Sequence, residues 1–269
     1  MHISKIFTFR LLPRATLILF SLSSFVILSH SFPPSLHASN NETLRIATYS
    51  LNEGGSNLIE DATSLITQSG ADVLLLQHVD ANTSFLLARH TQMDVAFFLI
   101  TEEAQGLAVL SKTRIAFDDG QLLGGSENLG GVQRVQIFVG TETLLTLYNV
   151  GLGFDQHGTE EITEQSLHET LAIIANDYPN GITGEKVIIG GSSTPLSDLS
   201  VVQQIEAIGF LDSFSGFSLE NSATVLPPAM QNHVPYLWTR NLQVVAANLI
   251  EDSVSDRRIA IIEIQIAAS

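Results

Sequence analysis

Residues 72–78 constrain the fold of this chain more than any other stretch. They read Asp-Val-Leu-Leu-Leu-Gln-His, and such a continuous apolar run is typical of a strand that is covered on both faces. A second strand-like stretch, residues 44–50, precedes it. The residues between them predict a helix, because Asn57 and Glu60 are spaced as a capping pair and Gly70 follows the last apolar position. Strand, helix and strand in this order predict a parallel crossover unit.

Beyond Met93 the pattern changes to short strands separated by Gly-containing turns. We expect strands at residues 95–100, 107–110, 132–139, 144–150 and 186–189, and a final alternating strand at residues 260–266. Two further helices are indicated, around Leu171 and around Val202. Many strands, few helices and mixed connections predict an α/β (α+β) fold, a four-layer sandwich of two packed mixed β-sheets flanked by helices.

The first 38 residues have the composition of a secretory signal peptide. Lys5, Arg10 and Arg14 precede an apolar run over residues 15–29, and Ala38 is a small residue at a plausible cleavage site. We expect cleavage there, which leaves one domain, residues 39–269, in a secreted or extracytoplasmic protein. The apolar run is short for a membrane span of ~20 residues. Retention as an N-terminal membrane anchor is the alternative.

The part of the chain from Ser39 on is strongly acidic. It contains all 28 Asp and Glu residues but only nine of the 12 Lys and Arg residues, so its formal charge is near −19. Such a surface repels phosphate backbones and anionic lipid head groups. We therefore expect a protein or small-molecule partner, no nucleic acid, and membrane contact only through an uncleaved N-terminal segment. The chain has no Cys, which excludes disulfides and thiolate metal sites.

Seven stretches, in chain order, resemble motifs of the endonuclease/exonuclease/phosphatase superfamily, which has the DNase I-like fold. Residues 44–50 resemble L-R-V-A-T-Y-N, 71–80 resemble A-D-V-V-L-L-Q-E-V-D, 106–111 resemble G-x-A-I-L-S, 147–152 resemble the N-x-H-L strand, 187–195 resemble V-I-L-G-D-F-N-x-P, 234–238 resemble I-D-Y-I-F, and 255–258 resemble S-D-H-R. The resemblance covers residues 44–267. It implies a phosphoesterase in which one or two Mg²⁺ or Mn²⁺ ions polarise a phosphate while His and Asp side chains activate a water.

Most of the catalytic positions that this resemblance implies carry other residues here. The metal-binding Asn and Glu fall on Ser50 and His78, the His of N-x-H-L on Gly151, the Asp and Asn of G-D-F-N on Gly191 and Ser193, the Asp of I-D-Y on Pro235, and the last His on Arg257. Asp256 alone is retained. The resemblance therefore predicts the scaffold of the family with a degenerate site.

The replacements differ in chemistry. Gly151 and Gly191 have no side chain, so neither can bind a metal or transfer a proton. His78 offers a neutral imidazole, which suits Zn²⁺ or Cu²⁺ better than Mg²⁺, although a lone His at a strand end is more often structural. Arg257 cannot act as a general base, but it can pair with Asp256.

Other motifs in the chain are weaker. Residues 151–154 lack the third Gly of a dinucleotide loop, Ser192 and Ser193 lie outside any G-x-S-x-G pattern, and His157, His168 and His233 lack the H-E-x-x-H spacing. Asp198, Asp212 and Asp256 remain candidates to converge in space.

Two hypotheses about function follow. The first is an exported relative with a degenerate site, no cofactor and a binding or scaffolding role. The alternative is an active hydrolase, a metal-dependent phosphodiesterase or phosphatase in which Asp256 and His78 form part of a rearranged Mg²⁺ or Mn²⁺ site.

Overall fold

The structure is a computed structural model. It describes residues 42–51, 58–101, 104–124, 130–140, 143–152, 160–193, 199–217, 234–251 and 258–266. These residues all belong to one compact unit, Ser39–Ser269. The predicted signal peptide, residues 1–38, lies outside the described residues and stays a prediction.

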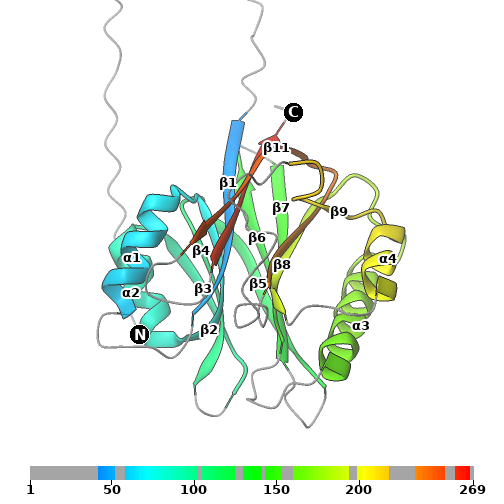
Figure 1. The fold of residues 1–269 in the computed structure, drawn as a ribbon, viewed down its shortest axis with the longest axis horizontal. Helices are drawn as coiled ribbons and strands as arrows, with labels where there is room; N and C mark the ends of the chain where they lie inside the picture. Colours follow the sequence, from blue (N-terminus) through cyan, green and yellow to red (C-terminus); the bar gives the residue numbers. More distant parts are fainter. Residues whose placement is uncertain are drawn as a thin grey trace, which may run out of the picture. The chain divides into compact units, whose positions relative to one another are not determined.

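Strands dominate the described chain (Figure 1). In order, the elements are β1 (Glu42–Ser50), α1 (Leu58–Ser69), β2 (Val73–Asp80), α2 (Ala81–Thr91), β3 (Asp94–Leu99), β4 (Gln105–Ser111), β5 (Ile115–Leu123), β6 (Gly130–Val139), β7 (Thr143–Leu152), α3 (Glu160–Asp177), β8 (Lys186–Ser193), α4 (Leu199–Ala207), β9 (Leu211–Asp212), β10 (Val234–Arg240), β11 (Gln243–Glu251) and β12 (Arg258–Ile266). In the described part of the chain, no helix is both long and apolar enough to cross a membrane.

The strands form two mixed sheets of six strands each. Sheet A has the order β11-β12-β1-β2-β4-β3, and sheet B has the order β5-β6-β7-β8-β10-β9. Each sheet has one parallel pair near its centre, β1 with β2 and β7 with β8. The parallel crossover predicted at the start of the chain is therefore confirmed, with α1 as its connecting helix.

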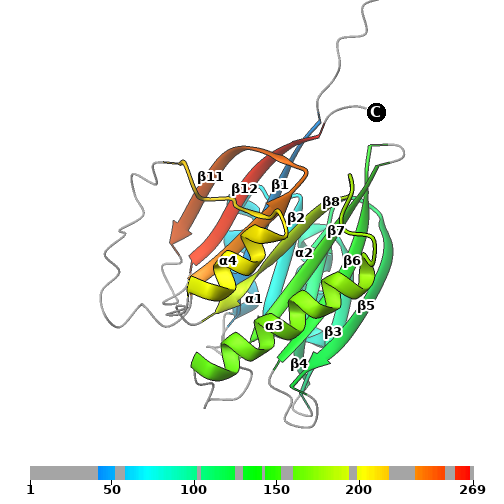
Figure 2. The same cartoon turned by 90° about the vertical axis from the view of Figure 1, so that its right-hand side faces the viewer.

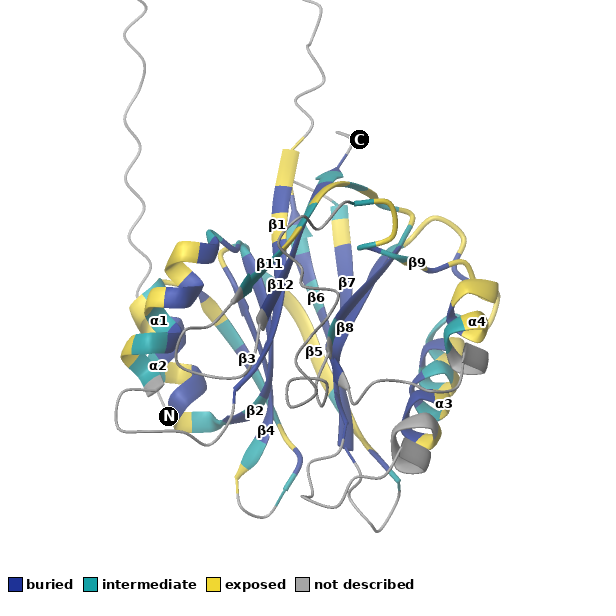
Figure 3. Ribbon diagram, in the orientation of Figure 1, coloured by how far each residue is buried: buried dark blue, intermediate teal, exposed yellow. Residues whose placement is uncertain are grey.

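The two sheets pack face to face, with α1 and α2 outside sheet A and α3 and α4 outside sheet B (Figures 1 and 2). This confirms the predicted four-layer sandwich. Figure 3 shows the central strands as almost wholly buried, while the helices alternate between buried and exposed positions. Fully buried side chains fill the layer between the sheets, among them Ile46, Leu75, Val135, Leu147, Ile188, Leu237 and Ile262.

A polar cluster ties α3 to the outer face of sheet B. The Tyr148 hydroxyl on β7 donates to Asp177 Oδ2 at the end of α3, at 2.6 Å. Arg134 on β6 forms an ion pair with the same carboxylate, with 3.2 Å between Arg134 Nη1 and Asp177 Oδ1. Burial and the hydrogen bond to Asp177 raise the pKa of Tyr148 far above its usual value. The phenol therefore stays a donor at neutral pH.

Helix α2 and strand β5 are among the elements that were not predicted from the sequence, as are β9, β10 and β11. Helix α2 has a weakly amphipathic sequence, and it begins at residue 81 because Asp80 caps it, accepting from the Thr83 N–H at 2.9 Å. Strand β5 contains Asp118-Asp119-Gly120, a sequence more typical of a turn. It extends because it pairs as an edge strand with β6, so tertiary pairing overrides the local preference.

Candidate functional site

The carboxyl ends of the two parallel strand pairs meet at one end of the sandwich. In sheet A, Ser50 at the end of β1 pairs with Gln77 on β2. In sheet B, Gly151 near the end of β7 pairs with Ser192 on β8. The two pairs face each other across the sandwich, because Asn149, two residues before Gly151, contacts sheet A directly. This is the end where the sequence predicts the site.

A buried polar layer joins the sheets directly below these strand ends. Gln77 Nε2 donates to Asn149 Oδ1 at 2.8 Å and to Thr48 Oγ1 at 3.0 Å. Asn149 Nδ2 donates to two backbone carbonyls of sheet A, Leu76 O at 3.0 Å and Ala108 O at 3.1 Å. Since Thr48, Gln77 and Asn149 are fully buried, each lost bond would leave an unpaired polar group away from water.

Above the polar layer, sheet B presents a row of four small residues. Gly131, Gly151, Ser192 and Pro235 are neighbours across β6, β7, β8 and β10. By the two-residue period of a strand they share the inner face with Asn149 and Leu237. Ser192 Oγ is the one side-chain polar atom of this row. It is buried and has no hydrogen-bond partner among the described residues.

Gly191 lies between Val150 and Tyr236 on the opposite, helix-covered face of sheet B. A Cβ atom built on Gly191 would lie 2.3 Å from the Val150 carbonyl oxygen and 2.6 Å from the Tyr236 hydroxyl. The Tyr236 ring, stacked at 4.6 Å from the Trp238 ring, therefore occupies the space that a side chain at residue 191 would need. Burial raises the pKa of Tyr236 well above its usual value.

The two positions equated with metal ligands lie in sheet A. Ser50 is buried at the end of β1. His78 is half-buried in a bulge of β2, since the pairing with β4 shifts register between Gln77 and Val79. Its φ of 53° lies in the left-handed region, which costs a residue with a Cβ free energy.

The remaining predicted site residues are placed only in part. Asp256, Arg257 and Asp198 lie outside the described residues, and of Ser193 only the backbone at the end of β8 is described. Asp212 lies in β9, where its Oδ1 accepts from the Phe214 N–H at 3.0 Å, a turn-forming role. Among the described residues, no three His, Asp or Glu side chains are grouped closely enough to hold a metal ion.

No protein-family model matches the sequence, and neither does any curated protein. Solved structures do match. An endonuclease/exonuclease/phosphatase from Bacteroides vulgatus superposes with a TM-score of 0.68 at 11% identity, over 84% of this chain and 100% of that one. The chain has the endonuclease/exonuclease/phosphatase fold.

Two further solved structures with this fold are similar to the same part of the chain. A family protein from Leptotrichia buccalis C-1013-b covers 83% of this chain and 100% of its own at 14% identity, with a TM-score of 0.59. Truncated TDP2 from Caenorhabditis elegans covers 83% of this chain and 98% of its own at 14% identity, with a TM-score of 0.63. At these identities the similarity shows the fold alone, and any chemistry must be argued from the residues of this chain.

Gln77 and Asn149 were not predicted from the sequence as important residues. Each is the one amide side chain of its strand and follows a run of mostly apolar residues, and each matches a letter of the motifs that residues 71–80 and 147–152 resemble. A single amide side chain within such a strand was the sequence feature that could have indicated a buried polar contact. The family motifs point to metal ligands and acid–base groups, whereas in the structure these two amides join the two sheets.

Proposed function

We propose that this protein is an exported domain with the endonuclease/exonuclease/phosphatase fold that has lost phosphoesterase chemistry and acts by binding or scaffolding. The observation that carries the proposal is the row of Gly131, Gly151, Ser192 and Pro235 at the strand ends of sheet B. General acid–base catalysis needs an imidazole, a carboxylate or a comparable group within hydrogen-bond reach of the substrate. This row offers one buried hydroxyl.

Gly191 gives a second observation, because its Cβ position faces the helix-covered side of sheet B and not the site. The resemblance equates this residue with an Asp, yet even a Cβ would meet a backbone oxygen at 2.3 Å. Real Cβ atoms do not approach other atoms so closely, and a backbone carbonyl in a central strand pair cannot move aside at low cost. The packing of β7, β8 and β10 is thus adapted to a residue without a side chain.

Charge and the N-terminal sequence support the remaining parts of the proposal. A formal charge near −19 after residue 38 opposes binding of a polyanion such as DNA. The basic and apolar composition of residues 1–38 supports export. Intact mass measured on the exported protein tests this part, with loss of residues 1–38 as the expected result. A full-length, membrane-bound product would favour the anchor instead.

A second candidate function is an active phosphoesterase with a rearranged metal site. The observation that favours it is the left-handed backbone of His78 in the bulge directly after Gln77, since strained residues often occur at functional positions. In this reading His78 and Asp256 would hold a divalent cation that activates a water. His78 also fits a plain β-bulge, because His is among the residues that tolerate this conformation.

Hydrolysis assays separate the two candidates. The purified protein is assayed on bis-p-nitrophenyl phosphate, plasmid DNA and sphingomyelin with Mg²⁺ or Mn²⁺, beside Asp256→Ala and the control Asp118→Ala. Asp118 is an exposed carboxylate on β5, so its removal leaves the site intact. We expect no turnover above the blank for any of the three proteins. Turnover that disappears in Asp256→Ala but persists in Asp118→Ala would refute the proposed loss of catalysis.

A further inference from the structure

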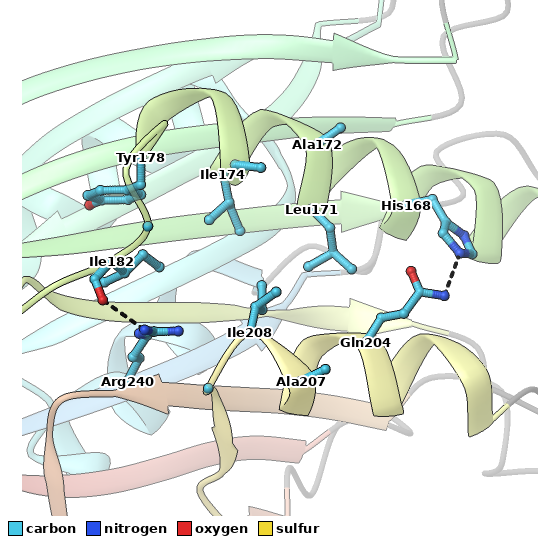
Figure 4. Close-up of a pocket in the computed structure, with 13 residues that line it drawn as sticks. His168, Leu171, Ala172, Ile174, Tyr178, Ile182, Gln204, Ala207, Ile208 and Arg240 are labelled. Atoms are coloured by element: carbon cyan, nitrogen blue, oxygen red, sulfur yellow. Dashed lines mark hydrogen bonds between the residues drawn. The ribbon is translucent and has the colours of Figure 1, made fainter.

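A groove of about 760 Å³ lies between α3 and α4, on the outer side of sheet B (Figure 4). Its walls are mostly apolar, with Leu171 and Ile174 from α3 and Ile208 directly after α4, and Tyr178 and Ile182 close to one end. It follows α3 from His168 to the end of that helix, which is about 14 Å at 1.5 Å per residue. The volume is within the range of about 300–1,000 Å³ that is typical of small-molecule sites.

The two ends of the groove differ in chemistry. At one end His168 and Gln204 form a hydrogen bond between the two helices, with 3.1 Å between their side-chain nitrogens. At the other end lies the guanidinium of Arg240, whose Nη2 donates to the Ile182 carbonyl at 2.7 Å (Figure 4). A Cβ built on Gly209 would lie 2.6 Å from Arg240 Nη1. The guanidinium is therefore seated against a glycine at the end of an apolar channel.

Arg240 is a cation without an anionic partner among the described residues. The ion pairs found there join Lys112 to Asp72 and Arg134 to Asp177. The whole chain has 28 acidic and 12 basic side chains, so a half-buried Arg that faces no carboxylate of the described segments is unusual. Its hydrogen bond to Ile182 uses one of five N–H donors, so the others are available to an anion.

We propose that this groove binds a small amphiphile with an unbranched alkyl chain and one carboxylate head group. The carboxylate pairs with Arg240, and the chain lies between α3 and α4 against Leu171, Ile174 and Ile208. The long shape and apolar walls match the alkyl chain, and the single unpaired cation at one end matches a single negative charge.

The groove is separate from the candidate site at the strand ends. Arg240 pairs with Val187 at the start of β8, whereas Pro235 pairs with Ser192 near its end. Arg240 lies five positions after Pro235 in β10, about 17 Å along the strand. Ligand binding in the groove therefore does not depend on whether phosphoesterase chemistry has been lost.

Calorimetric titration with matched ligand series tests the proposal. Octanoate, decanoate and dodecanoate are compared with octanol and decanol at neutral pH. We expect the carboxylates to bind about fourfold more tightly for each added methylene, until the groove is filled. We expect octanoate and decanoate each to bind roughly tenfold or more tightly than the alcohol of equal length, because the carboxylate head group makes charge-assisted hydrogen bonds.

Three variants assign the binding to the groove. Arg240→Met keeps the apolar stem and should lower carboxylate affinity to that of the alcohol, with alcohol binding unchanged. Ala175→Trp fills the groove from an exposed position on α3 and should abolish both. Asn176→Trp is the matched control, since Asn176 is the next residue, is also exposed, and does not line the groove.

The proposal is overturned if alcohols bind as tightly as carboxylates, or if Ala175→Trp binds like Asn176→Trp. It is equally overturned if sedimentation shows that the free protein is a dimer which Ala175→Trp dissociates, since a second copy of the chain would then occupy the groove.

Discussion

Replacement of Gly191 by alanine tests whether sheet B is packed around the absence of a side chain. The added methyl would lie 2.3 Å from the Val150 carbonyl oxygen and 2.6 Å from the Tyr236 hydroxyl. Overpacking of a buried site costs about 1–3 kcal/mol of unfolding free energy. We expect a cost in the upper part of this range, about 2–3 kcal/mol, because one of the two atoms is backbone in a central strand pair.

Gly190→Ala is the matched control on the same strand. A Cβ at Gly190 would meet Leu237 Cδ2 at 2.8 Å and Leu75 Cδ2 at 3.0 Å. Both are methyl ends of flexible side chains, which can shift by a few tenths of an ångström. We therefore expect this substitution to cost about 1 kcal/mol or less.

Urea unfolding and thermal melting measure both variants. For a domain of this size, 2–3 kcal/mol lowers the Tm by roughly 4–12 °C. A Gly191→Ala protein as stable as the wild type would contradict the packing argument, and so would a Gly190→Ala protein that is the less stable of the two. In the first case the position could accept a side chain, and one support for the proposed loss of catalysis would be gone.

Three further predictions concern the polar layer, the tyrosines and the metal. Asn149→Leu should lower the unfolding free energy by about 3 kcal/mol in urea titration, because it leaves two buried carbonyls and Gln77 short of partners. Gln136→Leu, which removes one half-buried bond to a threonine hydroxyl, should cost less than about 1 kcal/mol, and equal costs would contradict the role of the layer. In a tyrosinate absorbance titration of the native protein, fewer than all four tyrosines should ionise by about pH 11, because burial raises the pKa of Tyr148 and of Tyr236. Because the pKa values of both side chains are raised in the folded state, their contribution to the unfolding free energy is fully present below pH ~10. Above that pH the unfolded state loses protons that the folded state keeps, so stability should fall by up to about 1.4 kcal/mol per pH unit for each of the two, and ionisation of all four in the folded protein would contradict this. Finally, ~10 mM Mg²⁺ should change the Tm by less than about 1 °C relative to NaCl of equal ionic strength, whereas a site with a Kd near ~1 mM would raise it by roughly 3–6 °C. A rise of that size which is lost in Asp256→Ala would instead support the active enzyme.

Much of the fold could be predicted from the sequence because its signals are local. The apolar run at residues 73–76 required a strand covered on both faces. The helical stripe that became α1 and the Gly after it, whose φ is 65°, fixed the first crossover. The alternation at residues 260–266 predicted β12, with one face in the core. Helix α2 was missed because its stability depends on the Asp80 cap and on packing against sheet A more than on its own periodicity.

The candidate site could be located from the sequence but not built from it. Motif resemblance placed Ser50, His78, Gly151 and Gly191 at strand ends, and the order of the strands brought those ends together. The contacts within the site depend on packing between segments that are far apart in the chain. Gln77 meets Asn149 across 72 residues of sequence, and the Tyr236 ring occupies the space beside Gly191 because β10 pairs with β8.

The sequence by itself therefore determined most of the central strands, the sandwich and the identity of the side chains at the strand ends, since hydrophobic periodicity and motif letters are properties of short stretches. Tertiary structure alone decided the left-handed backbone of His78, the lack of space for a side chain at Gly191, and the place of the Arg240 guanidinium beside an apolar groove, with no anionic partner in the described part of the chain. These features depend on strand register, on which side chains face one another across a packed layer, and on where a charge finds no partner. Local sequence patterns give no direct indication of these features, because each depends on contacts between segments that are far apart in the sequence.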